Sequence, residues 1–253
     1  MDVNARRMAR DIVDANEKDI RAVKRDRWGD VMGTGASGDP TARIDAVAEE
    51  AAIRVIDEVG EVNVLSEECG FISKGSDHTL ILDPIDGTEN AIRGIPFYAI
   101  SIAIGRSGGG LAGVEYALVY NLATHDTYEA RGQEALFNGA PFDSKPARRQ
   151  RLAFSVQGPC PPLGGMRYKR RCLGAASLEI VLVAQGALDG YCNLGGKLRT
   201  TDVAAAALIL RATGGEIYGG DGKALEMSID SNERGGVLAL RDRKMIDQFG
   251  AWA

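Results

Sequence analysis

The segment ILDPIDGTEN, at residues 81–90, constrains this chain more than any other part of the sequence. An apolar run leads directly into Asp83, and Asp86 and Gly87 follow after one proline and one isoleucine. A short apolar run bounded by turn residues is typical of a buried strand. Because Pro, Asp and Gly are also ordinary turn residues, the pattern D-x-x-D-G fits two structures. It is either a plain turn or a strand that delivers two carboxylates to a metal site.

Helical and strand patterns extend along all 253 residues, enough chain for one large domain or two joined lobes. Helical periodicity and alanine-rich composition predict helices at 4–25, 41–59, 174–188, 202–215 and 243–252. Short apolar or alternating runs predict strands at 62–66, 79–83, 99–105, 111–120, 124–130, 152–158, 215–219 and 236–240. Between the first two helices, the glycine-rich residues 31–40 predict a break without the ending of a P-loop. We expect an α/β fold in a single unit, 1–253, with approximate lobes at 1–140, mainly antiparallel, and 141–253.

Composition argues against several classes of function. The formal net charge of −5 does not suggest a general affinity for nucleic acid or for an anionic membrane. The four cysteines form no C-x-x-C pair, which fits reduced thiols better than a disulfide framework or a zinc site. The N-terminal segment lacks the apolar core of a signal peptide and no apolar run reaches membrane-spanning length, so we expect a cytoplasmic protein. With only two histidines, hydrolytic chemistry would depend on carboxylates, hydroxyls and metals.

Four acids occupy the places where open α/β folds form their sites. Glu67 and Asp83 each follow an apolar run, Asp86 lies at the turn, and Asp202 begins an apolar helix. Like charges disfavour ionisation when they are crowded, and divalent cations would relieve the conflict. An all-oxygen set favours Mg²⁺ first, with Mn²⁺ possible and structural zinc disfavoured. Taken singly, Asp202 is also explained as a helix cap, and Glu67 with Glu68 as a solvated loop pair.

The strings DPIDGTEN, SEE and TDVAAAALILRATGG together resemble the inositol monophosphatase family of Mg²⁺-dependent, lithium-sensitive sugar phosphatases, over nearly the whole chain. The string RRCLGAASLE resembles its archaeal-type branch, whose members often hydrolyse both fructose 1,6-bisphosphate and inositol 1-phosphate. The resemblance implies an α+β layered sandwich, the sugar-phosphatase fold of alternating helix and sheet layers, with the metal site between the layers. It also implies a homodimer.

The resemblance assigns the metal ligands residue by residue. Glu67, Asp83 and the backbone carbonyl of Ile85 would hold the first metal, and Asp83 would bridge to a second metal held by Asp86 and Asp202. A third, weaker ion is expected near Glu67, so the cofactor would be two or three Mg²⁺ ions.

The same resemblance assigns the catalytic groups and the phosphate contacts. The backbone N–H groups of Gly87 and Thr88 would bind phosphate at a helix N-terminus. Asp39, with the Thr88 hydroxyl and alongside Glu67, would orient the attacking water for in-line displacement at phosphorus. From the residues alone, Asp39 followed by Pro40 is equally a plain turn.

The chain departs from the family pattern near the substrate. Thr201 stands where the family often has tryptophan, which should change only local packing. Asn193 and Gly195 stand where archaeal-type relatives tend to carry an acid and an arginine. The remaining candidates for the sugar end are Arg171, the backbone around Ala176, Asp86 and, more weakly, Arg199. The basic run RYKRR that contains Arg171 is equally well explained as a solvated surface.

Three functions therefore remain open. The first is hydrolysis of a small sugar or inositol phosphate, with fructose 1,6-bisphosphate and inositol 1-phosphate as the expected substrates. The second is a nucleotide 3′-phosphatase or NADP phosphatase of the same superfamily, for which the sequence shows no clear aromatic pair to stack on adenine. The third is a non-catalytic phosphate- or metal-binding regulator, which the complete set of acids disfavours.

Overall fold

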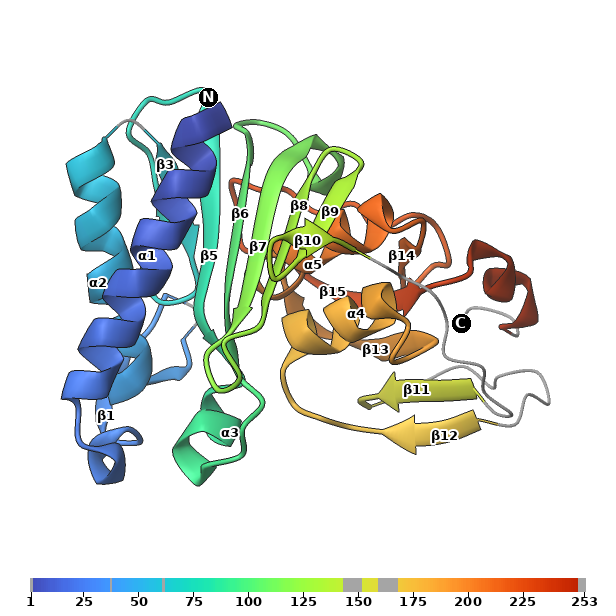
Figure 1. The fold of residues 1–253 in the computed structure, drawn as a ribbon, viewed down its shortest axis with the longest axis horizontal. Coiled ribbons are helices and arrows are strands. Elements are labelled where there is room, and N and C mark those ends of the chain that lie inside the picture. Colours follow the sequence, from blue (N-terminus) through green and yellow to red (C-terminus); the bar gives the residue numbers. More distant parts are fainter. Residues whose placement is uncertain (1, 37, 61, 143–151, 159–167, 250–253) are drawn as a thin grey trace.

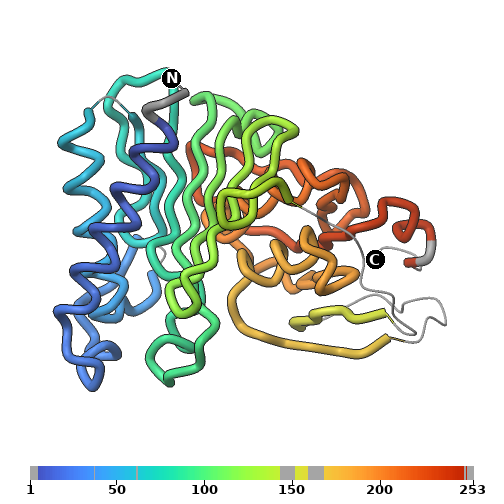
Figure 2. Tube along the Cα trace, viewed as in Figure 1, coloured from blue at the N-terminus to red at the C-terminus, as the bar shows by residue number. Residues whose placement is uncertain are grey.

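The computed structural model describes residues 2–36, 38–60, 62–142, 152–158 and 168–249. Figures 1 and 2 show four layers, in the order helices, sheet, helices, sheet. The predicted α/β class and the alternation of helix and sheet layers are confirmed. No helix in the described ranges is both long and apolar enough to cross a membrane.

The larger sheet has eight strands in the order β10-β9-β8-β7-β6-β5-β3-β4. Their bounds are β3 (Asn63–Ser66), β4 (Gly70–Ile72), β5 (His78–Asp86), β6 (Ala99–Arg106), β7 (Val114–Asn121), β8 (Thr127–Arg131), β9 (Glu134–Phe137) and β10 (Ala140–Pro141). The pairing is antiparallel except that β3 runs parallel to β5, with Ser66 opposite Leu82. The carboxyl ends of β3 and β5 therefore lie side by side.

Two long helices, α1 (Asp2–Ala22) and α2 (Arg43–Val59), cover one face of this sheet (Figure 1). Their apolar stripes follow the helical period and pack on alternate residues of the central strands. The result is a buried cluster that includes Ile12, Ile56, Leu80 and Ile102.

The other face of the large sheet is covered by α4 (Ala176–Gln185) and α5 (Thr200–Ala212), which also pack on the second sheet. The second sheet has the order β12-β11-β13-β15-β14, with β11 (Leu152–Val156), β12 (Tyr168–Arg171), β13 (Gly190–Arg199), β14 (Glu216–Gly219) and β15 (Arg234–Leu240). Residues from Thr200 to Leu210 of α5 are all buried, because the helix is enclosed by sheets on both sides. Its small alanine side chains suit that close approach.

Several predicted elements differ in detail. The glycine-rich residues 31–40, predicted as a break, include two short strands of a hairpin, β1 (Val31–Thr34) and β2 (Pro40–Ala42). Strand β13 was not predicted, because its sequence contains three glycines and its pairing with β15 is interrupted between Asn193 and Leu198. The predicted helix at 243–252 is a 3-10 helix at Arg243–Gln248, and its residues 250–252 lie outside the described ranges.

Strand β5 also runs further than its apolar run predicts. It continues through Pro84 to Asp86, with a shift of register against β6 between Asp83 and Asp86. Such an irregularity re-aims side chains within a strand. Both aspartates therefore belong to the strand, and the turn begins only at Gly87, which has a φ of 90° and precedes the short helix α3 (Thr88–Arg93).

The side chain of Asn90 ties α3 to the segment that leads into α4. Its amide nitrogen donates to the carbonyl of Phe97 at 2.8 Å and to the carbonyl of Leu173 at 2.7 Å, and the residue is 9% exposed. These two bonds fix the start of α3 against the start of α4. The two halves of the chain meet at this point.

We expect Asn90→Ala to lower the free energy of unfolding by about 1–3 kcal/mol, because two buried carbonyl groups lose their donor. Glu89→Ala on the same short helix is the matched control. Glu89 forms an exposed pair with Arg93, and such pairs contribute less than about 1 kcal/mol. Urea unfolding of the two variants measures the difference, and equal losses would contradict a tying role for Asn90.

Candidate active site and metal centre

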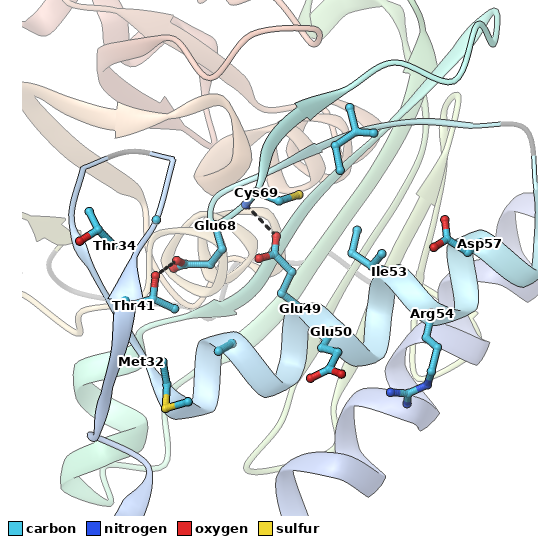
Figure 3. Close-up of a pocket in the computed structure, with 14 residues that line it drawn as sticks. Met32, Thr34, Thr41, Glu49, Glu50, Ile53, Arg54, Asp57, Glu68 and Cys69 are labelled. Carbon is cyan, nitrogen blue, oxygen red and sulfur yellow. Dashed lines mark hydrogen bonds between the residues drawn. The ribbon is translucent and has the colours of Figure 1, made fainter.

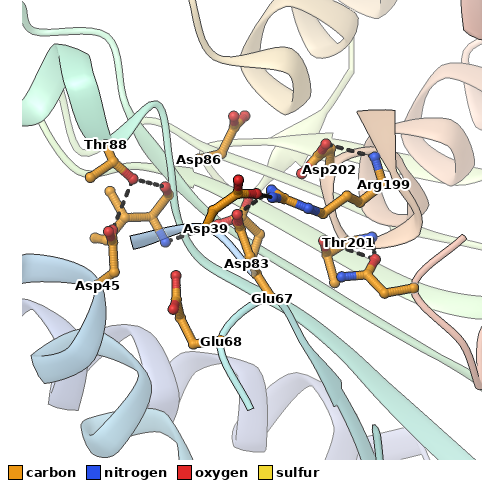
Figure 4. Close-up of polar contacts among 12 residues, drawn as sticks. Asp39, Asp45, Glu67, Glu68, Asp83, Asp86, Thr88, Arg199, Thr201 and Asp202 are labelled. Atoms are coloured by element: carbon orange, nitrogen blue, oxygen red, sulfur yellow. Dashed lines mark hydrogen bonds and ion pairs between the residues drawn. The ribbon is translucent and has the colours of Figure 1, made fainter. Parts of the chain in front are cut away.

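Three carboxylates from three elements converge between the layers. Glu67 directly follows β3, Asp83 lies in β5, and Asp202 lies in the first turn of α5. Each offers an oxygen atom, and these atoms all lie within 4.8 Å of one another (Figure 4). The parallel pairing of β3 with β5 brings the first two together, and the packing of α5 between the sheets adds the third.

Asp86 stands beside this group of three, and its carboxylate faces the N-terminus of α4. One oxygen accepts from the backbone N–H of Ala176 at 3.0 Å. The other accepts from the backbone N–H of Ser177 at 2.7 Å and from the Ser177 hydroxyl at 2.5 Å. Asp86 and Ala176, which the resemblance places in metal and substrate binding, are therefore direct neighbours.

Thr88 pairs with an acid other than the one predicted. Its hydroxyl lies 2.8 Å from Oδ1 of Asp45 and 3.0 Å from the carbonyl oxygen of Ile85, and it donates to these acceptors. The expected partner, Asp39, lies elsewhere, in the loop between β1 and β2, where its side chain is 61% exposed and accepts from Arg199. In this structure the Thr88 hydroxyl is thus bonded to Asp45 and not to Asp39, because the β1–β2 hairpin brings Asp39 to Arg199 at the end of β13.

Asp45 was missed by reading the sequence. It lies in the first turn of α2 and is only 6% exposed. An acid at that position is ordinarily explained by its favourable interaction with the helix dipole. The signal available in the sequence was an acid between two apolar residues, Ile44 and Ala46, at the predicted start of a helix.

Burial governs the electrostatics of the site. It raises the pKa of four carboxyl groups to about 7, namely Asp45, Glu67, Asp86 and Asp202. For Glu67 the nearby charge of Asp202 adds to the effect, whereas Arg199 opposes it. Burial and four neighbouring carboxylates also raise the pKa of Asp83 well above its usual value. A cation placed among these groups would stabilise their ionised forms.

The two basic candidates for substrate binding, Arg171 and Arg199, have different surroundings, and so do Asn193 and Gly195, which depart from the family pattern. Arg171 ends the edge strand β12, is exposed, and donates to the backbone carbonyl of its neighbour Arg170 at 2.9 Å. Arg199 instead lies among the acids. The Asn193 amide lies 3.4 Å from the side-chain oxygen of Gln157, and Gly195 is exposed.

A cavity of about 550 Å³ opens under the β1–β2 hairpin (Figure 3). Its lining includes Met32, Thr41, Glu49 and Glu68, but none of the three grouped acids. Thr41 donates to Glu68 at the side of the cavity nearest to those acids. The cavity therefore adjoins the candidate site without containing it.

The raised pKa values predict that the metal-free protein loses stability as pH rises. A carboxyl group with a pKa of about 7 in the folded chain and about 4 in the unfolded chain binds more protons when folded, between those two values. The free energy of unfolding therefore falls across that window and levels off above it. In EDTA, calorimetry should show a lower unfolding temperature at about pH 8 than at about pH 5, and added Mg²⁺ should restore it mainly at the higher pH.

The variant Asp83→Asn provides the control for this experiment, because it removes one of the crowded charges. It should flatten the pH dependence in EDTA and reduce the response to Mg²⁺. An unfolding temperature that is independent of pH in the unmodified chain would contradict the electrostatic account.

Comparison with known proteins agrees with this geometry. A sequence model of the inositol monophosphatase family matches residues 2–248. The chain is 33% identical to a fructose-1,6-bisphosphatase/inositol-1-monophosphatase of Thermococcus kodakarensis, over 87% of this chain and 85% of that protein. It is 30% identical to a bifunctional NADP phosphatase/NAD kinase of Methanococcus maripaludis, over 96% of this chain and 49% of that protein. A crystal structure of an inositol monophosphatase–fructose 1,6-bisphosphatase superposes with a TM-score of 0.85 at 28% identity, covering 96% of each chain. The chain belongs to the inositol monophosphatase family.

Proposed function

We propose that the protein is a Mg²⁺-dependent phosphomonoesterase that hydrolyses fructose 1,6-bisphosphate and inositol 1-phosphate. The observation that carries the proposal is the grouping of Glu67, Asp83 and Asp202 within 4.8 Å in a chain of this family. Relatives from several archaea bear the name fructose-1,6-bisphosphatase/inositol-1-monophosphatase, at 30–36% identity.

The donor set fits a hard divalent cation. Glu67, Asp83 and Asp202 offer only oxygen atoms and are crowded enough that burial and mutual repulsion raise the pKa of each. In this proposal Asp86, whose charge acts on Asp83, and the carbonyl of Ile85 would complete the set, both from β5. When bound, Mg²⁺ would lower the pKa of water and stabilise negative charge on the leaving oxygen.

The Thr88–Asp45 pair is suited to orient and deprotonate the attacking water. The Thr88 hydroxyl donates to Asp45, which leaves the lone pairs of its oxygen to accept a hydrogen bond from water. Burial raises the pKa of Asp45 to about 7 while no cation is bound, and a cation nearby would favour the ionised form that accepts a proton. In this proposal Asp45 takes the role that the sequence had given to Asp39.

The turn after β5 requires glycine at position 87. Gly87 has a left-handed conformation, and a Cβ there would lie 3.0 Å from the Cβ of Ala175 and 3.1 Å from the carbonyl oxygen of Phe97. Only glycine fits both constraints. The backbone N–H groups of Gly87 and Thr88 would then bind the phosphate oxygens, with Ala176 and Asp86 meeting the sugar.

Arg171 is the proposed partner for the second phosphate of a bisphosphate. It stands exposed five positions before Ala176, on the segment that leads from β12 into α4. The homodimer and the cytoplasmic location remain predictions from the sequence.

A second candidate function is hydrolysis of NADP, supported by the relatives named bifunctional NADP phosphatase/NAD kinase. This chain spans about half the length of those proteins. Both functions would use the same acids and differ in what the pocket accepts beyond the phosphate.

The experiment that tests the proposal measures phosphate release from esters supplied at equal concentration, with Mg²⁺ or with EDTA. The panel contains fructose 1,6-bisphosphate, inositol 1-phosphate, adenosine 3′,5′-bisphosphate and NADP. We expect the first two to be the best substrates and EDTA to abolish activity. Preference for NADP supports the second candidate, and no release from any ester would support a non-catalytic binding protein.

Asp45→Asn should lower kcat by about a hundredfold or more, because general-base catalysis contributes about 10²–10⁴-fold. Asp39→Asn, measured at saturating Mg²⁺, should lower kcat by less than about tenfold, or 1.4 kcal/mol. The amide keeps the shape of each side chain, so the pair isolates the carboxylate. The opposite ranking would return the water-activating role to Asp39.

Arg171→Ala should lower kcat/KM for fructose 1,6-bisphosphate by about ten- to a hundredfold, since a charged hydrogen bond contributes about 1.5–3 kcal/mol. Inositol 1-phosphate has no second phosphate, so its hydrolysis should change little. Lys169→Ala, in the same exposed strand, should affect neither substrate. Large and equal losses for both substrates in Arg171→Ala would indicate a structural role instead.

A further inference from the structure

Arg199 places a positive charge inside the group of acids. It is the last residue of β13 and directly precedes α5. Its Nη1 donates to Oε1 of Glu67, and its own backbone N–H donates to Oδ2 of Asp202 at 2.8 Å (Figure 4). Two of the three grouped acids are therefore bonded to this one residue.

The other end of the guanidinium is bonded to Asp39. Nη2 of Arg199 donates to Oδ2 of Asp39, and the same oxygen also accepts from Nη2 of Arg234 at 3.3 Å. Asp39 is 61% exposed, whereas the side chain of Arg199 is only 13% exposed. The guanidinium thus extends from Glu67, whose side chain is 21% exposed, to the much more exposed Asp39 of the β1–β2 hairpin.

Among the described residues, the Arg199 side chain does not satisfy all of its hydrogen-bond donors on its buried side. Nε of Arg199 is buried and has no hydrogen-bond partner within the described ranges. A buried donor without an acceptor is unfavourable, so the missing hydrogen bond reduces the stabilisation that the guanidinium contributes in this position. If it released Glu67, it would keep its bond to Asp39 and move toward solvent.

We propose that Arg199 is an internal counter-ion that competes with a divalent cation for Glu67 and thereby sets the metal concentration at which the site fills. This inference rests on the proposed role of Glu67, Asp83 and Asp202 as a metal site. Glu67 bonded to a guanidinium is a weaker ligand for a cation than a free carboxylate. A dication that enters the group also meets the repulsion of the positive charge already there.

Arg199 would then have two linked effects, one on the stability of the chain and one on metal binding. Arg199 stabilises the chain when metal is scarce, because it offsets the repulsion among buried carboxylates. It also weakens metal binding, because the bond between its guanidinium and Glu67 has to be exchanged. A residue that only organised the acids would stabilise the chain and strengthen metal binding.

The test compares Arg199→Met with Arg234→Met in the full chain. Methionine keeps an unbranched apolar stem and removes the charge. Arg234 contacts the exposed Asp39 and serves as the matched control. Binding of Mn²⁺ is measured by the loss of the free-ion electron paramagnetic resonance signal, and thermal unfolding is followed in EDTA and in Mg²⁺.

We expect Arg199→Met to bind Mn²⁺ about tenfold more tightly than the unmodified chain, and to unfold at a lower temperature in EDTA. Its gain in unfolding temperature on adding Mg²⁺ should be larger than that of the unmodified chain. Arg234→Met should change the Mn²⁺ affinity by less than about twofold. Unchanged or weaker Mn²⁺ binding by Arg199→Met would overturn the proposal.

If Arg199→Met does not fold, Arg199→Lys decides the question. An ammonium group cannot bridge Glu67 and Asp39 as a planar guanidinium does, so tighter Mn²⁺ binding is again expected, by a smaller factor. Equal or weaker binding overturns the proposal here too. If the unmodified chain binds no Mn²⁺ and releases no phosphate, the proposed function fails. If it does both while the variants do not tighten binding, only the inference about Arg199 fails.

Discussion

Carboxyl groups that repel one another are held together at the ends of β3 and β5 and at the start of α5. Burial raises the pKa of Asp83 well above its usual value. Repulsion by four neighbouring carboxylates raises it further, those of Glu67, Asp86, Asp202 and Asp45. A group of buried carboxylates that repel one another lowers the stability of the folded chain. Bound cations would offset this cost, and the roles proposed for the neighbouring residues follow from that.

The layered fold provides the stiffness that this crowding requires. The acids lie on two parallel strand ends and on a helix enclosed by two sheets, so none can relax away without disturbing a packed core. The start of α4 performs a similar task for Asp86, whose two oxygens accept three hydrogen bonds from Ala176 and Ser177. The same backbone that closes the core therefore fixes the direction of each carboxylate.

Much of this arrangement was predictable because it depends on local pattern. The apolar runs that end in Glu67 and Asp83 indicated buried strands, and the alanine-rich stretch after Asp202 indicated an apolar helix. The features that the local pattern did not predict depend on partners that are distant in the sequence. Strand β13 has a glycine-rich sequence and is recognisable by its pairing with β11 and β15. Asp45 resembles an ordinary acid in the first turn of a helix until α3 is packed against it.

The sequence by itself determined the family, the layered α/β class and the acids that gather at the candidate site, because these follow from motif, periodicity and charge. Only the tertiary structure decided which acid meets the Thr88 hydroxyl, which way Asp39 points, and that Arg199 lies on Glu67. Those contacts join residues from separate elements. They depend on the direction of side chains after the helices and sheets have packed, and no spacing along the chain encodes that direction.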